Sequence, residues 1–296
     1  MKTFILIISI VSSSFCLGQE DVLRHDYYWN QEENAKAIIG VKNCYVRLEP
    51  NLTSQILDSL QVGKEVTFIK STENFLKIRG INVCWAQIEY KNNNGETQTG
   101  YLWKGSLALN FIKNKSNIYL TTIDKIYIKK EKEDFNPQYF AISVSILDLN
   151  SKMLDQKTIQ RNVTESAFFT NKTIGNLGLK NLEDIYRISF GGQACGIGIY
   201  YYYFGWNGSK LLLLPEKYEV ADAGAYYHSE NFIFPKEKDG KPNLIIKIIE
   251  EAENIANSES DRFIFKITEW KEIYTWNGEK ASFLKKEKPR NYVKKE

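Results

Sequence analysis

Residues 140–146 read FAISVSI, and this short stretch decides the fold class. Phe140, Ile142, Val144 and Ile146 fall on one side of an extended chain, while alanine and serine fall on the other. Period-two alternation of this kind is typical of a strand with one buried face. No segment sustains a helical period beyond about ten residues. The sequence therefore predicts an all-β protein.

Further strand-like runs and turn signals surround this stretch. Residues 199–206 form a dense aromatic run, and the tripeptide Trp-Asn-Gly occurs at 206–208 and again at 276–278. Asn-Gly tolerates the positive φ of tight hairpin turns. We predict a larger antiparallel β-domain, a sandwich or propeller-like, over residues 113–286. Residues 164–171 are interpreted as a short helix within it.

One loop in this region carries a weak resemblance. Residues 238–246 read KDGKPNLII, and the stretch 238–249 resembles the loop and strand of an FG-GAP propeller repeat. In that family several loop aspartates bind calcium, but here Asp239 stands among lysines. A hard cation needs several oxygen ligands. We therefore expect no calcium site, no other metal and no cofactor.

The first third of the chain contains a series of short strand-like stretches that are separated by turns. Residues 45–51 read YVRLEPN, residues 56–66 read ILDSLQVGKEV, and residues 100–107 read GYLWKGSL. With Trp85 and the turn at Gly95, they resemble a bacterial SH3-like (SH3b) domain over roughly residues 37–110. The resemblance implies a small, strongly bent β-barrel, set here at residues 37–112. It also implies recognition of a peptide, a cell-wall glycan or a protein partner rather than catalysis.

The two ends of the chain are set apart by composition. Residues 1–18 have a positive start, a short apolar core and small residues near Gly18, the pattern of a signal peptide. The apolar run is shorter than the roughly 20 residues of a membrane-spanning helix. We predict cleavage after Gly18 and a periplasmic or extracellular protein; an uncleaved anchor and a lipid-modified Cys16 are the alternatives. Residues 19–36 form a polar lead-in, and residues 287–296 a basic tail expected to be solvated and frayed.

Charge and histidine content narrow the function classes. Thirty-nine basic and 36 acidic residues leave a formal charge of +3, which makes no electrostatic case for nucleic acid. His25 and His228 are the only histidines, so chemistry built on paired histidines is nearly excluded. No apolar run after the signal is long enough to span a membrane. The sequence leaves the oligomeric state open.

Three cysteines remain once the signal is removed. Alternation puts Cys44 on an inward face with Leu48, and Cys84 on an inward face with Ile88. In an exported protein these two cysteines are candidates for a disulfide that closes a loop of about forty residues. The alternative is two free buried thiols that pack as small hydrophobic groups. Cys195 is the remaining thiol.

Four aromatic residues of the SH3-like region form the predicted ligand-binding site. Tyr45, Trp85, Tyr101 and Trp103 point away from the small core by the same alternation. Aromatic faces supply large contact area at low entropic cost, so together they could line a shallow groove. The alternative is that they pack against the larger domain or the lead-in segment.

Candidate chemistry is confined to one stretch of the larger domain. The glycine-rich run 191–198 lacks the lysine and the following helix of a phosphate-binding loop, so we interpret its glycines as close packing within a sheet. Cys195 inside it is a candidate nucleophile only if His228 lies beside it as a base. Glu219, Asp222 and Glu230 flank that histidine.

Three function classes follow from these features. The main prediction is an exported, non-catalytic envelope protein that binds a partner through its SH3-like region. The first alternative is a hydrolase, which should show a pocket with converging titratable groups in the larger domain. The second is an immunity or inhibitor protein that acts by surface contact.

Overall fold

Antiparallel strands make up most of the residues that the structure describes. The computed structural model describes residues 23–129, 137–162, 168–192, 194–256 and 263–295, so the predicted signal at 1–18 lies outside the described residues. Within these ranges there are two 3₁₀ turns, η1 (Asp26–Tyr28) and η2 (Lys104–Ser106), and no α-helix. The prediction of an all-β protein is confirmed.

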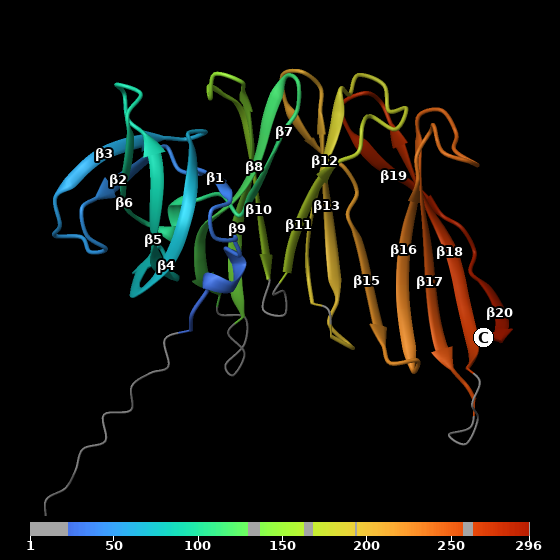
Figure 1. Ribbon diagram of the computed structural model, residues 1–296. Helices are drawn as coiled ribbons and strands as arrows, with labels where there is room; N and C mark the ends of the chain where they lie inside the picture. Colours follow the sequence, from blue (N-terminus) through green and yellow to red (C-terminus); the bar gives the residue numbers. More distant parts are fainter. Residues whose placement is uncertain (1–22, 130–136, 163–167, 193, 257–262, 296) are drawn as a thin grey trace, which may run out of the picture.

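The first sheet has six strands, in the order β1-β4-β5-β6-β2-β3 (Figure 1). They are β1 (Lys36–Ile38), β2 (Asn43–Arg47), β3 (Ile56–Gln61), β4 (Glu65–Ile78), β5 (Ile81–Lys91) and β6 (Thr97–Trp103). Ile39, just beyond β1, bridges to Leu107, just beyond η2. The sheet forms a half-barrel, with Val46, Phe68 and Leu102 buried in its core.

A four-stranded sheet and the first part of a ten-stranded sheet follow, and these two layers pack face to face. The first has the order β10-β9-β8-β7, with β7 (Asn110–Lys113), β8 (Asn117–Ile128), β9 (Gln138–Asp148) and β10 (Met153–Asn162). The second comprises β11 (Phe168–Thr173), β12 (Asp184–Gly191), β13 (Ile199–Trp206) and β14 (Leu211–Leu213). Tyr119 of β8 stacks on Tyr186 of β12 with ring centroids 5.3 Å apart, and the backbone N–H of Leu211 donates to Asp155 at 2.6 Å. This part of the larger domain is a β-sandwich.

The second layer continues as a long antiparallel sheet. The added strands are β15 (Lys217–Asp222), β16 (Tyr226–Ile233), β17 (Leu244–Asn254), β18 (Ile264–Trp276), β19 (Ala281–Lys286) and β20 (Arg290–Lys295). Strands β15 to β18 follow in chain order, and β19 and β20 both pair with β18 along its outer side (Figure 1). The expectation of a frayed basic tail is therefore wrong, because residues 290–295 form a paired strand.

The lead-in joins the half-barrel to the sandwich. Tyr28 is buried and packs edge-on against Phe140 of β9, with ring centroids 5.1 Å apart. The indole N–H of Trp29 donates to the carbonyl of Leu107 at 2.9 Å. One hydrophobic cluster runs from the half-barrel through both layers of the sandwich. The predicted boundary near residue 112 is therefore a change of sheet within a continuous core.

Of the two possibilities left open for Cys44 and Cys84, the structure shows two free thiols rather than the candidate disulfide. Both residues are buried, as the alternation indicated, but both are free thiols. Strand β6 lies between β2 and β5, which carry the two cysteines. Strands two places apart are separated by about 9–10 Å, beyond the roughly 4.4–6.8 Å that a disulfide allows between Cα atoms. Burial raises the pKa of the Cys44 thiol to about 12.

Two local expectations about the larger domain need correction. Residues 168–171, expected in a helix, belong to β11, which pairs with β12; residues 163–167 lie outside the described part of the chain. The two Trp-Asn-Gly tripeptides do lie in hairpins, but each loop has four residues, since Trp206 pairs with Leu211 and Trp276 with Ala281. In both loops the asparagine side chain accepts hydrogen bonds from the backbone two and three residues on.

Candidate functional site

The four predicted ligand-binding aromatics share one face of the half-barrel by strand register. Trp85 pairs directly with Trp103, and Tyr101 lies opposite Arg47 of β2. Trp85 and Trp103 are nevertheless only 3% and 6% exposed, and the Trp103 indole donates to the carbonyl of Leu76 at 2.9 Å. The predicted groove of four exposed aromatics is therefore wrong at the two tryptophans, which are buried, and the Trp103 indole bonds to β4 of the half-barrel itself.

The other two aromatics keep exposed surface, and further exposed apolar side chains lie on the β2–β3 hairpin. Tyr45 is 53% exposed, and Tyr101 is partly exposed. Four more apolar side chains are exposed within the next twelve residues of the chain. We call the set the hairpin surface; it consists of Tyr45, Leu48, Leu52, Ile56 and Leu57.

Sequence periodicity missed most of the hairpin surface. Leu48 was expected inside with Cys44, but it is exposed because β2 ends at Arg47. The pairing of β2 with β3 also shifts register between Val46 and Arg47. The extra residue of this bulge is Leu57 on β3, so the bulge interrupts the two-residue alternation of β3, where Ile56 and Leu57 are both exposed. The Glu49-Pro50-Asn51 turn signal was the available clue that alternation stops at the end of β2.

Hydrogen bonds hold the loop that carries Leu52. The Asn51 side chain accepts from the backbone N–H groups of Thr53 at 3.0 Å and Ser54 at 2.8 Å. The Arg47 guanidinium donates to the carbonyl of Ser54 at 2.7 Å. The exposed leucine therefore stands on a pre-organised loop, which lowers the entropic cost of binding through it.

Strand β3 is also a sheet edge. It ends the strand order and pairs only with β2 among the described residues. Its outer side thus presents backbone N–H and C=O groups next to the hairpin surface. An edge of this kind can accept an added strand from another chain.

The larger domain holds a separate pocket of about 720 Å³ between the start of β13 and strands β15 and β16. We call it the β15 pocket. The structure brings Cys195, Glu219 and His228 to its lining, together with the mainly apolar Gly192, Ala194, Ile197, Ile199, Val220, Ala221, Ala223, Tyr227 and Ser229. Asp222 and Glu230, the other acids singled out in the sequence, are not part of that lining.

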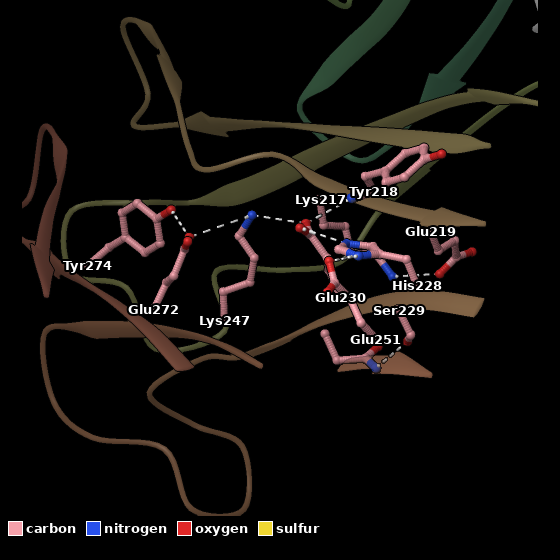
Figure 2. A network of polar contacts seen from close by, with 11 residues as sticks. Lys217, Tyr218, Glu219, His228, Ser229, Glu230, Lys247, Glu251, Glu272 and Tyr274 are labelled. Atoms are coloured by element: carbon pink, nitrogen blue, oxygen red, sulfur yellow. Dashed lines mark hydrogen bonds and ion pairs between the residues drawn. The ribbon is translucent and has the colours of Figure 1, made fainter. Parts of the chain in front are cut away.

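His228 is held by carboxylates rather than by the thiol. Its Nε2 lies 3.2 Å from Glu230 and its Nδ1 lies 3.4 Å from Glu251 (Figure 2). No hydrogen bond or ion pair joins His228 to Cys195, both of which the structure describes. A base for the thiol needs a ring nitrogen within hydrogen-bond reach. The geometry gives the hydrolase alternative no nucleophile–base pair at this histidine.

A row of polar contacts extends from His228 across three strands (Figure 2). Glu230 accepts from the ammonium of Lys247 at 2.9 Å and from the backbone N–H of Tyr218 at 2.9 Å. Lys247 also lies 3.9 Å from Glu272, which accepts from the Tyr274 hydroxyl at 2.7 Å. Burial, reinforced by that carboxylate, raises the pKa of Tyr274. Because its charges are paired side by side, the row ties β16, β17 and β18 together.

Part of the glycine-rich run 191–198 lines the β15 pocket, and two of its glycines are required by close packing. A Cβ added at Gly198 would lie 2.2 Å from the Tyr218 ring, and one at Gly191 would lie 2.6 Å from Ile199. The close-packing interpretation is confirmed at Gly191 and Gly198 but is wrong at Gly196, where nothing lies within 4 Å of an added Cβ and a φ of 76° favours glycine instead. The N–H of Gly196 donates to the carbonyl of Ala221 at 2.8 Å, which fastens the run to β15.

No group of three or more histidine, cysteine, aspartate or glutamate side chains that could hold a metal ion occurs in the described ranges. Asp239 lies in the loop between β16 and β17, where it adopts a φ of 64°. Within the same ranges, no helix has the length and apolar character needed to cross a membrane.

Comparison of the chain with models of known protein families gives no match, and comparisons with curated proteins and with solved structures give none either.

Proposed function

We propose that this chain is an exported binding protein that captures an extended segment of a partner protein along strand β3. The observation that carries the proposal is the hairpin surface, with five large apolar side chains exposed within thirteen residues of an edge hairpin. Exposed apolar clusters of this kind mark interaction sites in soluble proteins. Backbone groups of β3 would supply affinity, and the hairpin surface would select side chains.

A contrast between two edges of the molecule supports this choice. The edge strands β19 and β20 end in lysine pairs, Lys285-Lys286 and Lys294-Lys295. Lysines on an edge strand oppose the addition of another strand. Strand β3 reads ILDSLQ and carries no lysine. Of these two edges, the one formed by β19 and β20 carries lysines that oppose strand addition, and the edge formed by β3 does not.

The resemblance to SH3b domains agrees with this proposal. The residues that carry it lie on β2, β3 and β6, at the start of β4, at Trp85 of β5 and on the turns beside these strands. An SH3-like identity for the half-barrel, with its implied recognition of peptide or envelope material, belongs to the proposal. So does export, which rests on the composition of residues 1–18.

The test starts from the chain without residues 1–18 and a displayed library of random twelve-residue peptides. Peptides enriched on the protein are synthesised, and their Kd is measured by fluorescence anisotropy. We expect Ile56→Asn combined with Leu57→Asn to weaken binding at least tenfold. The matched control is Phe283→Asn combined with Leu284→Asn, two neighbouring exposed apolar residues on β19, which should leave Kd unchanged. Equal loss in both double variants, or in neither, contradicts the proposal.

A further inference from the structure

The β15 pocket is a second site, independent of the hairpin surface. Its volume of about 720 Å³ falls in the range of small-molecule sites, roughly 300–1,000 Å³. Alanine, glycine, valine and isoleucine supply most of its lining. Such a wall suits an apolar ligand body.

One carboxylate reaches this apolar wall. Glu219 of β15 pairs in register with Ile199, and Ala221 pairs with Tyr227. Because alternate residues of a strand share a face, Glu219 and Ala221 project to the same side, where all four residues line the pocket. His228 also lines the pocket, but its two ring nitrogens already lie near the carboxylates of Glu230 and Glu251. Among the lining residues that the structure describes, Glu219 is therefore the one carboxylate that can meet a ligand.

Glu219 keeps capacity to bind a ligand. It accepts one hydrogen bond from the Tyr201 hydroxyl and one from Lys217, whose ammonium lies 3.2 Å away. An ionised carboxylate offers about four acceptor positions. Its side chain is 31% exposed, so the remaining positions are open to a donor in the pocket.

The surrounding strands give the pocket a negative field. Strands β15, β16 and β17 carry six carboxylates against two lysines, a formal balance of −4 with His228 neutral, whereas the whole chain is +3. The two lysines, Lys217 and Lys247, are each paired with a glutamate. A field of this sign attracts cations and repels anions such as fatty acids.

We propose that the β15 pocket binds an organic cation: an amine-bearing molecule whose apolar body fills the pocket and whose ammonium group pairs with Glu219. This site is separate from the proposed partner-binding edge at β3 and stands or falls without it.

The probe is dansylcadaverine, a fluorescent primary amine with an apolar body. Dansylamide, which is neutral, and dansylglycine, which is anionic, share its fluorophore and serve as comparison probes. Each is titrated with the chain lacking residues 1–18, and the rise in emission gives Kd. We expect saturable binding of the amine, with Kd at least tenfold below that of the anion.

Three variants locate the bound probe. Glu219→Gln keeps the shape of the side chain and removes its charge, and we expect it to raise Kd for the amine about fivefold or more. Glu253→Gln, on β17 but outside the lining, removes the same charge from the field and should raise Kd less than twofold. Ala221→Phe places a ring in the pocket from an exposed position and should abolish saturable binding while circular dichroism stays unchanged.

Several results overturn the proposal. One is tighter binding of dansylglycine than of dansylcadaverine, and another is no saturable binding of the amine to the unmodified chain. A third is an equal effect of Glu219→Gln and Glu253→Gln, which would show attraction by the field without a contact. A folded Ala221→Phe variant that still binds the amine would place the probe elsewhere.

Discussion

Trp85 and Trp103 are direct cross-strand partners on β5 and β6, and both are buried. The aromatic face of the half-barrel is thereby divided into two parts with different roles. The tryptophan pair stabilises the fold, while Tyr45 and its apolar neighbours on the β2–β3 hairpin remain open to a partner.

Replacing Trp103 should destabilise the half-barrel, whereas replacing the exposed Tyr45 should not. We expect Trp103→Ala to lower the free energy of unfolding by about 3–5 kcal/mol, since it removes a large buried ring and leaves the Leu76 carbonyl without its donor. Tyr45→Ala should cost no more than about 0.5 kcal/mol. Urea denaturation followed by tryptophan fluorescence measures both. Similar costs for the two variants would contradict the division of this face.

The cysteines should differ sharply in reactivity. With the chain lacking residues 1–18, we expect one thiol, Cys195, to react quickly with DTNB at pH 8, because Cys44 and Cys84 are buried. In 6 M guanidinium without reductant all three should react, since none is bridged. A count of one in denaturant would instead reveal the disulfide that the strand order forbids.

Stability should fall in alkaline solution. Burial raises the pKa of Tyr186, Tyr202 and Tyr203 from 10.0 to about 12. Between those values the unfolded chain has released protons that the folded chain keeps, so the free energy of unfolding decreases as pH rises. The stabilisation is fully present below about pH 9 and is lost progressively toward pH 12. Urea midpoints at pH 8, 9, 10 and 11 test this; a constant midpoint would contradict the burial of these phenols.

Gly80 should resist substitution more than Gly95. Both have positive φ, +79° and +81°, but a Cβ at Gly80 would lie 1.9 Å from the Ile126 carbonyl oxygen, whereas nothing lies within 4 Å at Gly95. Gly95→Ala should cost about 1 kcal/mol for the backbone alone. Gly80→Ala should cost clearly more, because the half-barrel must move away from β8. Thermal denaturation of both variants measures the difference. Equal decreases in Tm would contradict the expectation, because they would mean that the contact with Ile126 relaxes without cost.

The ion pair between Lys247 and Glu230 lends itself to a double-mutant cycle. Both side chains are nearly buried, and removal of one partner strands the other charge. We expect Lys247→Met to destabilise by about 3 kcal/mol and the double variant with Glu230→Gln to be less destabilised than that. Chemical denaturation of the three variants gives the coupling. If the two single-variant costs simply add, the Glu230 carboxylate is stabilised by Tyr218 and His228 without Lys247, which would contradict the expected coupling.

Local alternation predicted much of the fold, and its failures have two causes. Strand β9 follows the pattern of residues 140–146, and Cys44 and Cys84 are buried as predicted. Alternation says which face a residue takes but not which strands are neighbours, so it could not show that β6 separates the two cysteines. It also assumes one buried face, whereas residues 81–86 of β5 are all buried.

The candidate sites could be predicted only in part from the sequence, because strand pairing, a bulge and loops position many of their residues. Tyr45 was found because a short strand leaves every second residue outside. Leu52 and Ile56 were missed because a bulge and a loop position them. Cys195 and His228 reach one lining through the pairing of β13, β15 and β16, which no local signal encodes. The basic end of the chain likewise pairs with β18 at a distance its composition does not reveal.

Hydrogen exchange at the amides of β3 tests the central proposal most directly. The chain lacking residues 1–18 is labelled in D₂O with and without a peptide enriched from the library, and exchange is read by mass spectrometry. Strand addition predicts that amides in Ile56–Gln61 exchange at least tenfold more slowly with the peptide, while those of Ala281–Lys286 on β19 do not change. Protection that leaves residues 43–61 unaffected, wherever else it occurs, would contradict binding at the β3 edge.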